Sequence, residues 1–135
     1  MENPALLYVE DDPESCEIMR LLVEEVMQMN HLTIFEDSHD FLSRLDDLSQ
    51  QPDIFLLDIH VPPHNGFEML QMLRQHDKYQ STPVVALTAS VMNEEVQQLK
   101  TAGFDGVLAK PLDMDAFPII LQRILKGETI WHIMA

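Results

Sequence analysis

Short apolar runs alternate along the chain with stretches whose apolar residues follow a helical period. Five of the runs have the length of strands, and they are Ala5 to Val9, Leu32 to Phe35, Ile54 to Leu57, Val84 to Leu87 and Val107 to Ala109. The third and fourth runs are continuously apolar, which is typical of strands buried on both faces. The strict alternation of strand-like and helix-like segments predicts a doubly wound α/β fold, with five parallel strands and five helices that cover both faces of the sheet.

Capping residues and glycines mark where these helices begin and end. Asp12 precedes a proline, and this pair is a typical helix start because a carboxylate caps the first turn and proline fits the first helical position. We expect Ser38 to cap the second helix and Gly103 to end the fourth in a left-handed conformation. Pro118 fits the fifth helix if Asp115 is its cap, because the missing N–H then falls in the first turn.

The net charge excludes two classes of partner. The chain has 8 Lys and Arg residues against 23 Asp and Glu residues, which gives a formal net charge of −15. A surface this acidic repels phosphate backbones and anionic lipid head groups. We therefore expect no direct binding of nucleic acid or membranes, and we expect divalent cations and basic protein surfaces to bind instead.

Three further features predict a soluble domain of the cytoplasm. The single cysteine, Cys16, cannot form an internal disulfide, which favours a reducing compartment. No apolar run approaches the roughly 20 residues of a membrane-spanning helix, and the first residues lack the basic and apolar regions of a signal peptide. We divide the chain into one domain at residues 1–127 and a short tail at 128–135, which is too short to be an output domain.

Polar residues follow four of the five predicted strands at one edge of the sheet. In open α/β sheets, ligands bind beyond the carboxyl ends of the strands. The polar strand-end residues are Glu10 and Asp11 after the first run, Asp58 after the third, Thr88 after the fourth and Lys110 after the fifth. The fold therefore gathers carboxylates, a hydroxyl group and an ammonium group at one edge.

This set of side chains favours magnesium and phosphoryl chemistry. Crowded carboxylates repel one another, and a hard cation with oxygen ligands such as Mg²⁺ relieves that repulsion. An aspartate can then act as the nucleophile that forms an aspartyl phosphate. A Walker-type NTPase would need a Gly-x-x-x-x-Gly-Lys loop, which the chain lacks. An aspartate-based phosphatase of the haloacid dehalogenase type would need a second Asp where His60 stands.

Four short motifs follow one another in a fixed order along the chain. They are Val9-Glu10-Asp11-Asp12-Pro13, Leu56-Leu57-Asp58-Ile59 with Pro62 and Gly66, Leu87-Thr88-Ala89, and Ala109-Lys110-Pro111. In order and spacing, these motifs resemble the receiver domain of two-component response regulators, and the resemblance covers residues 5–125. It implies a flavodoxin-like sheet with strand order 2-1-3-4-5 and a cis peptide bond between Lys110 and Pro111.

The resemblance also implies a signalling role. Asp58 matches the phosphoacceptor, Thr88 the switch hydroxyl and Lys110 the lysine that neutralises phosphoryl charge. A sensor histidine kinase or a phosphotransfer domain would supply the phosphoryl group from a phosphohistidine. The chain would then be a single-domain response regulator that signals by binding a downstream target protein. It would catalyse only its own phosphorylation and slow dephosphorylation, so we do not expect an enzyme.

The same resemblance implies a magnesium site. Asp11 matches the direct ligand of Mg²⁺, and Glu10 matches a ligand that acts through water. Asp58 and the backbone carbonyl of His60 match the remaining protein ligands. We expect Asp12 to cap a helix rather than to bind the metal.

One position departs from the family pattern. Receiver domains usually carry Tyr or Phe three residues before the lysine, and that ring turns inward on phosphorylation. Val107 occupies this position. The departure favours an alternative hypothesis, in which the chain is a receiver-like interaction module that phosphorylation does not switch.

Two surfaces are candidates for protein contacts. The resemblance places docking of the phosphoryl donor near Ser15, Met19 and Pro111. The apolar tail residues, Ile130, Trp131, Ile133 and Met134, either pack back onto the domain or form the contact of a homodimer. Of these two interpretations we favour packing.

Overall fold

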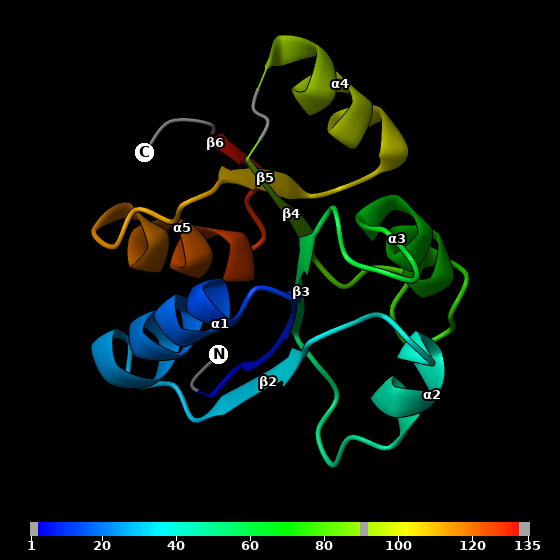
Figure 1. The fold of residues 1–135 in the computed structure, drawn as a ribbon, viewed down its shortest axis with the longest axis horizontal. Helices are drawn as coiled ribbons and strands as arrows, with labels where there is room; N and C mark the ends of the chain where they lie inside the picture. Colours follow the sequence, from blue (N-terminus) through cyan, green and yellow to red (C-terminus); the bar gives the residue numbers. More distant parts are fainter. Residues whose placement is uncertain (1–2, 90–91, 133–135) are drawn as a thin grey trace.

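One parallel sheet with helices on both faces forms the computed structural model, which describes residues 3–89 and 92–132 (Figure 1). The strands are β1 (Ala5–Val9), β2 (His31–Phe35), β3 (Ile54–Asp58), β4 (Val84–Thr88), β5 (Gly106–Ala109) and β6 (Ile130–His132). Their order across the sheet is β2-β1-β3-β4-β5-β6. The doubly wound prediction is confirmed, and the predicted count of five strands is corrected to six.

Five helices connect the strands, as predicted. They are α1 (Pro13–Arg20), which continues as the π-helical segment η1 (Leu21–Val26), α2 (Phe41–Asp46), α3 (Gly66–Arg74), α4 (Asn93–Ala102) and α5 (Ala116–Leu125). Helices α1 and α5 cover one face of the sheet, and α2, α3 and α4 cover the other (Figure 1). Within residues 3–89 and 92–132, no helix has the length and apolar character needed to cross a bilayer.

Two of the predicted helix boundaries are confirmed in atomic detail. Asp12 caps α1, and its Oδ2 atom accepts hydrogen bonds from the Ser15 backbone N–H at 3.0 Å and from the Ser15 hydroxyl at 2.7 Å. Gly103 ends α4 with a φ of 107°, a left-handed conformation that glycine adopts without steric cost. Asp12 is therefore occupied as a cap, as the sequence predicts.

The predicted cap of α2 is wrong. Helix α2 begins after Asp40, while Ser38 is buried and bonds to a different loop. The Ser38 hydroxyl donates to the His64 carbonyl at 2.7 Å and accepts from the His64 N–H at 2.6 Å. These two bonds connect the segment after β2 to the loop between β3 and α3.

The start of α5 differs from the prediction in the side chain that caps the helix. Asp115 is the residue before the helix, but its side chain makes no capping bond. Asp113 supplies the acceptor instead, because its Oδ1 atom takes hydrogen bonds from the N–H groups of Asp115 and Ala116 at 2.8 and 3.0 Å. Pro118 lies in the first turn, where the helix needs no N–H from it.

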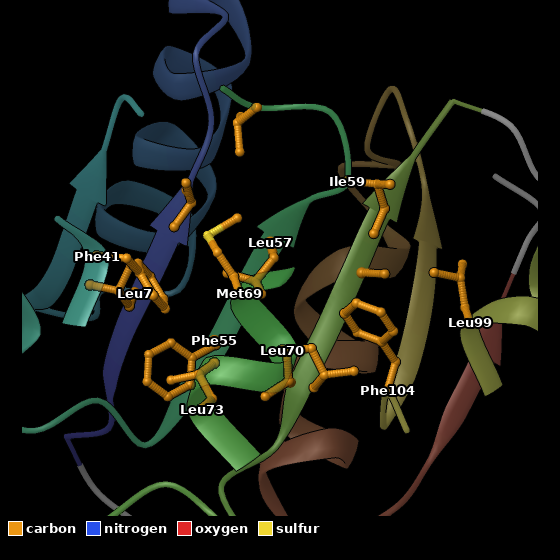
Figure 2. Close-up of a cluster of buried hydrophobic side chains, with 14 of the residues drawn as sticks. Leu7, Phe41, Phe55, Leu57, Ile59, Met69, Leu70, Leu73, Leu99 and Phe104 are labelled. Atoms are coloured by element: carbon orange, nitrogen blue, oxygen red, sulfur yellow. The ribbon is translucent and has the colours of Figure 1, made fainter. Parts of the chain in front are cut away.

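The sheet has a dry core on each face, which explains the continuous apolar runs. Figure 2 shows the cluster beneath α2, α3 and α4, where residues of β1 and β3 pack against α3. The labelled members of this cluster include Leu7, Phe55, Leu57, Met69, Leu70 and Leu73. A second cluster lies beneath α1, η1 and α5 and contains Leu6 and Tyr8. Alternate residues of β1 thus point to opposite faces, so Tyr8 lies on the α1–α5 side.

The apolar tail packs back onto the domain, as favoured from the sequence. Ile130 packs against the α1–α5 cluster, and Trp131 packs against the other. Trp131 pairs with Val107 in the β5–β6 register, and the Lys100 ammonium lies 5.1 Å from its ring centroid. A Cβ atom at Gly106 would lie 2.6 Å from the Ile130 carbonyl oxygen, so β6 approaches β5 closely because residue 106 has no side chain. Tail residues 133 and 134 lie outside the described residues.

Candidate functional site

The polar residues predicted to share one edge of the sheet do lie together at the carboxyl ends of the central strands. The register pairs Val9 with Leu57, Asp58 with Leu87, and Thr88 with Ala109. Because the strands are parallel, the residue that follows each of these positions emerges at the same edge. The sheet therefore places the side chains after β1, β3, β4 and β5 around one small region.

Lys110 connects the two buried acids of this edge. Its Nζ atom lies 2.7 Å from Glu10 Oε1 and 3.2 Å from Asp58 Oδ2. The carboxylate side chains are 1% and 8% exposed, and the lysine side chain is 20% exposed. The peptide bond between Lys110 and Pro111 is cis, as the family resemblance implies. One ammonium group thus serves two carboxylates that are almost completely shielded from water.

The pKa values of the two buried acids are shifted in opposite directions. Burial raises the pKa of Glu10 above its ordinary value, and the adjacent carboxylate of Asp58 raises it further. Burial also acts to raise the pKa of Asp58, but its neighbours Glu10, the His60 N–H and Lys110 outweigh this effect and hold it below the ordinary value. The His60 N–H donates to Asp58 Oδ1 at 3.1 Å. The lowered pKa means that Asp58 is ionised at neutral pH.

The carboxylates form a cluster suited to a hard cation. One oxygen from each of Glu10, Asp11 and Asp58 lies within 4.8 Å of the others, with Asp11 exposed and the other two buried. Three negative groups face the single ammonium group of Lys110, so a cation is electrostatically favoured, and oxygen ligands match Mg²⁺. His60 contacts Asp58 through its N–H, and the expected role of its carbonyl as a ligand stays a prediction.

Thr88 lies beside a cavity that separates it from α4. The residue is 4% exposed and ends β4, next to the strand that carries Asp58. The cavity has a volume of about 200 Å³, and its lining includes Ile59, His60, Phe67, Thr88, Glu95 and Leu99. Val107 is fully buried on the neighbouring strand β5, directly opposite Trp131 in the β5–β6 register. The aromatic ring of Trp131 therefore lies beside Val107, the position that differs from the family pattern, although it belongs to a different strand.

The predicted docking residues do not all reach the surface. Met19 is fully buried in the α1–α5 cluster, so its predicted contact with a phosphoryl donor is wrong. Met19 lies on the apolar side of α1 and packs into the core beneath that helix. Ser15 and Pro111 instead line a small cavity of about 30 Å³ beside Lys110.

Sequence reasoning missed Tyr8. The residue is 1% exposed, and its hydroxyl donates to Glu10 Oε1 at 2.8 Å. Burial is the main reason that its pKa lies far above the ordinary value, and the charge of Glu10 adds to the effect. The signal was present in the sequence, since residues two apart on a strand point to the same face and only a tyrosine in this apolar run carries a hydroxyl.

The chain is similar to known proteins over nearly its whole length. A family model of the response regulator receiver domain matches residues 6–122. The chain is 29% identical over 126 residues to the signal transduction histidine-protein kinase BarA of Escherichia coli, which covers 93% of this chain and 13% of BarA. It is 30% identical over 129 residues to the response regulator Rre1 of Synechocystis, which covers 94% of this chain and 54% of Rre1. It therefore spans a small part of one relative and about half of the other.

Solved structures show the same fold. The receiver domain of the sensor histidine kinase PA1611 from Pseudomonas aeruginosa is described with a magnesium ion coordinated in its active-site cleft. It superposes with a TM-score of 0.79 at 23% identity, and covers 93% of this chain and 99% of that one. Fold and acidic edge define a receiver-type domain of two-component signal transduction. The family match over residues 6–122 shows that the chain belongs to the response regulator receiver domain family.

Proposed function

We propose that the domain accepts a phosphoryl group on Asp58 in a Mg²⁺-dependent reaction and signals through altered protein–protein interaction. A phosphohistidine on a sensor histidine kinase or a phosphotransfer domain is the proposed donor. The observation that carries this proposal is the geometry around Asp58, a nearly buried carboxylate that lies 3.2 Å from the Lys110 ammonium within a cluster of acids. The domain is then a phosphoacceptor rather than an enzyme with a separate substrate.

The transfer forms one bond and breaks another. An Asp58 oxygen attacks the phosphorus atom, the N–P bond of the phosphohistidine breaks, and the electron pair stays on the leaving imidazole. Lys110 neutralises charge on the phosphoryl oxygens, because its ammonium already lies beside the acceptor oxygen. Mg²⁺ bound by Asp11 and Asp58, with Glu10 acting through water, would supply further charge neutralisation. That assignment rests on the donor set and on the magnesium reported for the PA1611 receiver.

Two features support a change of shape after transfer. Phosphorylation places almost two negative charges on Asp58, which draws the Lys110 ammonium and the Thr88 hydroxyl toward the phosphoryl oxygens. The cavity beside Thr88 gives α4 room to move, and Oε2 of Glu95 on α4 is buried without a hydrogen-bond partner among the described residues. We propose that the phosphate biases α4 between two positions and thereby changes the surface seen by a target protein.

The test uses two acids at opposite ends of β3. Acetyl phosphate with Mg²⁺ should add one phosphoryl group to the wild type, measured by intact mass spectrometry, and Asp58→Asn should abolish the addition. Asp53→Asn is the matched control, because Asp53 precedes the same strand at the other edge of the sheet. That variant should be phosphorylated like the wild type. Labelling that persists in Asp58→Asn would place the acceptor elsewhere.

A second candidate function is supported by Val107. With no ring on β5 to turn inward, the domain could bind partners in a way that phosphorylation leaves unchanged. Hydrogen exchange of α4 separates the two functions. An exchange rate that changes on phosphorylation supports the switch, while unchanged exchange in a fully phosphorylated sample supports the unswitched interaction module.

A further inference from the structure

The hydroxyl group of Tyr8 faces the acidic edge from inside the core. Tyr8 lies on the α1–α5 side of β1, between Ile34 on β2 and Leu56 on β3 in the strand register. Its ring is part of an apolar cluster, which a phenylalanine would fill equally well. Its hydroxyl donates to Glu10 Oε1 at 2.8 Å. The hydroxyl therefore needs an explanation that packing of the ring does not give.

Glu10 Oε1 receives two strong donors in this structure. Tyr8 donates to it at 2.8 Å and Lys110 at 2.7 Å, while Oε2 accepts from the Asp12 N–H at 3.3 Å. Glu10 is fully buried, so an oxygen that loses its donor gains no water in exchange. Two donors on one oxygen mean that either can leave without stranding the carboxylate.

Lys110 is the donor that phosphoryl transfer requires to leave. In this structure it divides its ammonium between Glu10 and Asp58. A phosphoryl group on Asp58 offers it more concentrated negative charge than Glu10 does. Tyr8 and Lys110 also line one small cavity of about 30 Å³. When Lys110 turns to the phosphoryl group, Tyr8 remains as the donor on Glu10 Oε1.

We propose that Tyr8 is a positioning residue for phosphoryl transfer, whose hydroxyl satisfies Glu10 and so frees Lys110 to move to the phosphoryl group on Asp58. The inference rests on the proposed function, because it assigns a part in that reaction. The Tyr8 hydroxyl bonds to Glu10, so it would act on the reaction at Asp58 through Glu10 and Lys110. It acts by lowering the free-energy cost of separating Lys110 from Glu10.

Tyr8→Phe tests this role, with Tyr79→Phe as the matched control. The chain has two tyrosines, and Tyr79 is buried in the core on the opposite face of the sheet. Tyr8→Phe should slow phosphorylation by acetyl phosphate at saturating Mg²⁺ by about 10- to 100-fold, the usual effect of losing one hydrogen bond to a charged group. It should weaken binding of the phosphoryl mimic beryllofluoride by a similar factor. Tyr79→Phe should leave both quantities unchanged.

Magnesium affinity separates positioning from a general structural effect. Lys110 still holds Glu10 in the unphosphorylated Tyr8→Phe variant, so the dissociation constant for Mg²⁺ alone should change by less than about twofold. Equal losses of Mg²⁺ and beryllofluoride affinity would mean a distorted site and would overturn the proposal. Unchanged phosphorylation and beryllofluoride binding in Tyr8→Phe would overturn it as well.

A measurement on the wild type keeps the proposal testable if Tyr8→Phe does not fold. With ¹³Cζ-labelled tyrosine, the Tyr8 resonance should shift when beryllofluoride and Mg²⁺ are added, because Oε1 loses its second donor. The Tyr79 resonance should stay in place. A static Tyr8 resonance in a protein that binds beryllofluoride contradicts the role of Tyr8, whereas a wild type that binds no beryllofluoride and accepts no phosphoryl group contradicts the proposed function itself.

Discussion

The two edges of the sheet both hold carboxylates, but they neutralise them in different ways. At the amino edge, Asp53 Oδ2 accepts a hydrogen bond from the Ala5 N–H at 2.8 Å. Asp105 Oδ2 accepts from the Val84 N–H at 2.9 Å and from Arg74 Nη2 at 2.8 Å. Each of these acids precedes one strand and bonds to the first N–H of a neighbouring strand. Their charge is used to hold strand ends in register.

At the carboxyl edge three carboxylates lie close together. Glu10 and Asp58 share the ammonium group of Lys110, Asp11 lies beside them, and no arginine contacts these three acids in the described part of the chain. The surplus negative charge favours binding of a cation, and the bound cation can in turn neutralise a phosphoryl group. The comparison teaches that the crowding of carboxylates around one shared ammonium group, rather than the presence of Asp or Glu, distinguishes a reactive edge from a structural one.

Lys110→Ala should give the largest effect at the carboxyl edge. The variant loses the group that neutralises the phosphoryl oxygens, so phosphorylation by acetyl phosphate should slow by about 100-fold, the typical result of removing one such donor. Stopped-flow or gel-shift rates measure this change. Lys100→Ala is the control, because it removes an ammonium that lies over Trp131 instead. An unchanged rate in Lys110→Ala would show that the ammonium is idle.

Asp105→Ala should have the opposite pattern at the amino edge. It leaves the Val84 N–H and the Arg74 guanidinium short of an acceptor, so the free energy of unfolding should fall by about 2 kcal/mol. Urea denaturation measures this loss, and the difference from the wild type should be the same with and without Mg²⁺. The phosphorylation rate of the folded protein should match the wild type. If Asp105→Ala instead altered the rate and left stability intact, the contrast between the edges would be wrong.

Magnesium should stabilise the fold through the carboxyl edge alone. At a concentration ten times its dissociation constant, a ligand that binds the folded state raises the free energy of unfolding by about 1.4 kcal/mol. Thermal denaturation with and without Mg²⁺ should show this gain in the wild type and in Asp53→Asn. Asp11→Asn should lose most of the gain, and retention of the full gain there would remove Asp11 from the metal site.

Acid titration of two variants should give small effects of opposite sign. Because the pKa of Glu10 is raised in the folded state, the wild type should gain stability relative to Glu10→Gln as the pH falls through that raised pKa toward 4.5, its ordinary value. The pKa of Asp58 is lowered, so the wild type should lose stability relative to Asp58→Asn as the pH falls from 3.8 through the lowered pKa. Urea denaturation in Mg²⁺-free buffer measures both differences. Slopes of equal sign would contradict the assignment of the two carboxyls.

Much of this arrangement could be predicted from the sequence because it follows from local patterns. A continuous apolar run such as Ile54 to Leu57 requires burial on both faces, and the following residue must then lie at the carboxyl edge. The positions of Asp58, Thr88 and Lys110 follow from that rule. Their identity as a set also matches the receiver motifs, which is why the acidic edge and the strand order were both predictable.

The features that were missed depend on contacts between distant residues. The pair of Arg74 and Asp105 joins residues 31 positions apart, and neither lies in a recognisable motif. The Ser38 hydroxyl had two possible partners, a helix N–H or a distant loop, and only the folded chain selects the loop. Strand β6 is three residues long and follows a helix, so the segment was too short to show the alternating pattern that predicts a strand.

Because Gly106 has no side chain, a substitution at this position can change how β6 pairs with β5. A methyl group at this position would overlap the Ile130 carbonyl oxygen, so Gly106→Ala would push β6 away from its neighbour. The change adds one carbon atom, leaves the length of the chain intact and touches none of the acids that converge around Lys110. It would therefore expose the backbone of β5 to other proteins while the phosphoryl chemistry stays in place, so binding and chemistry could be varied independently.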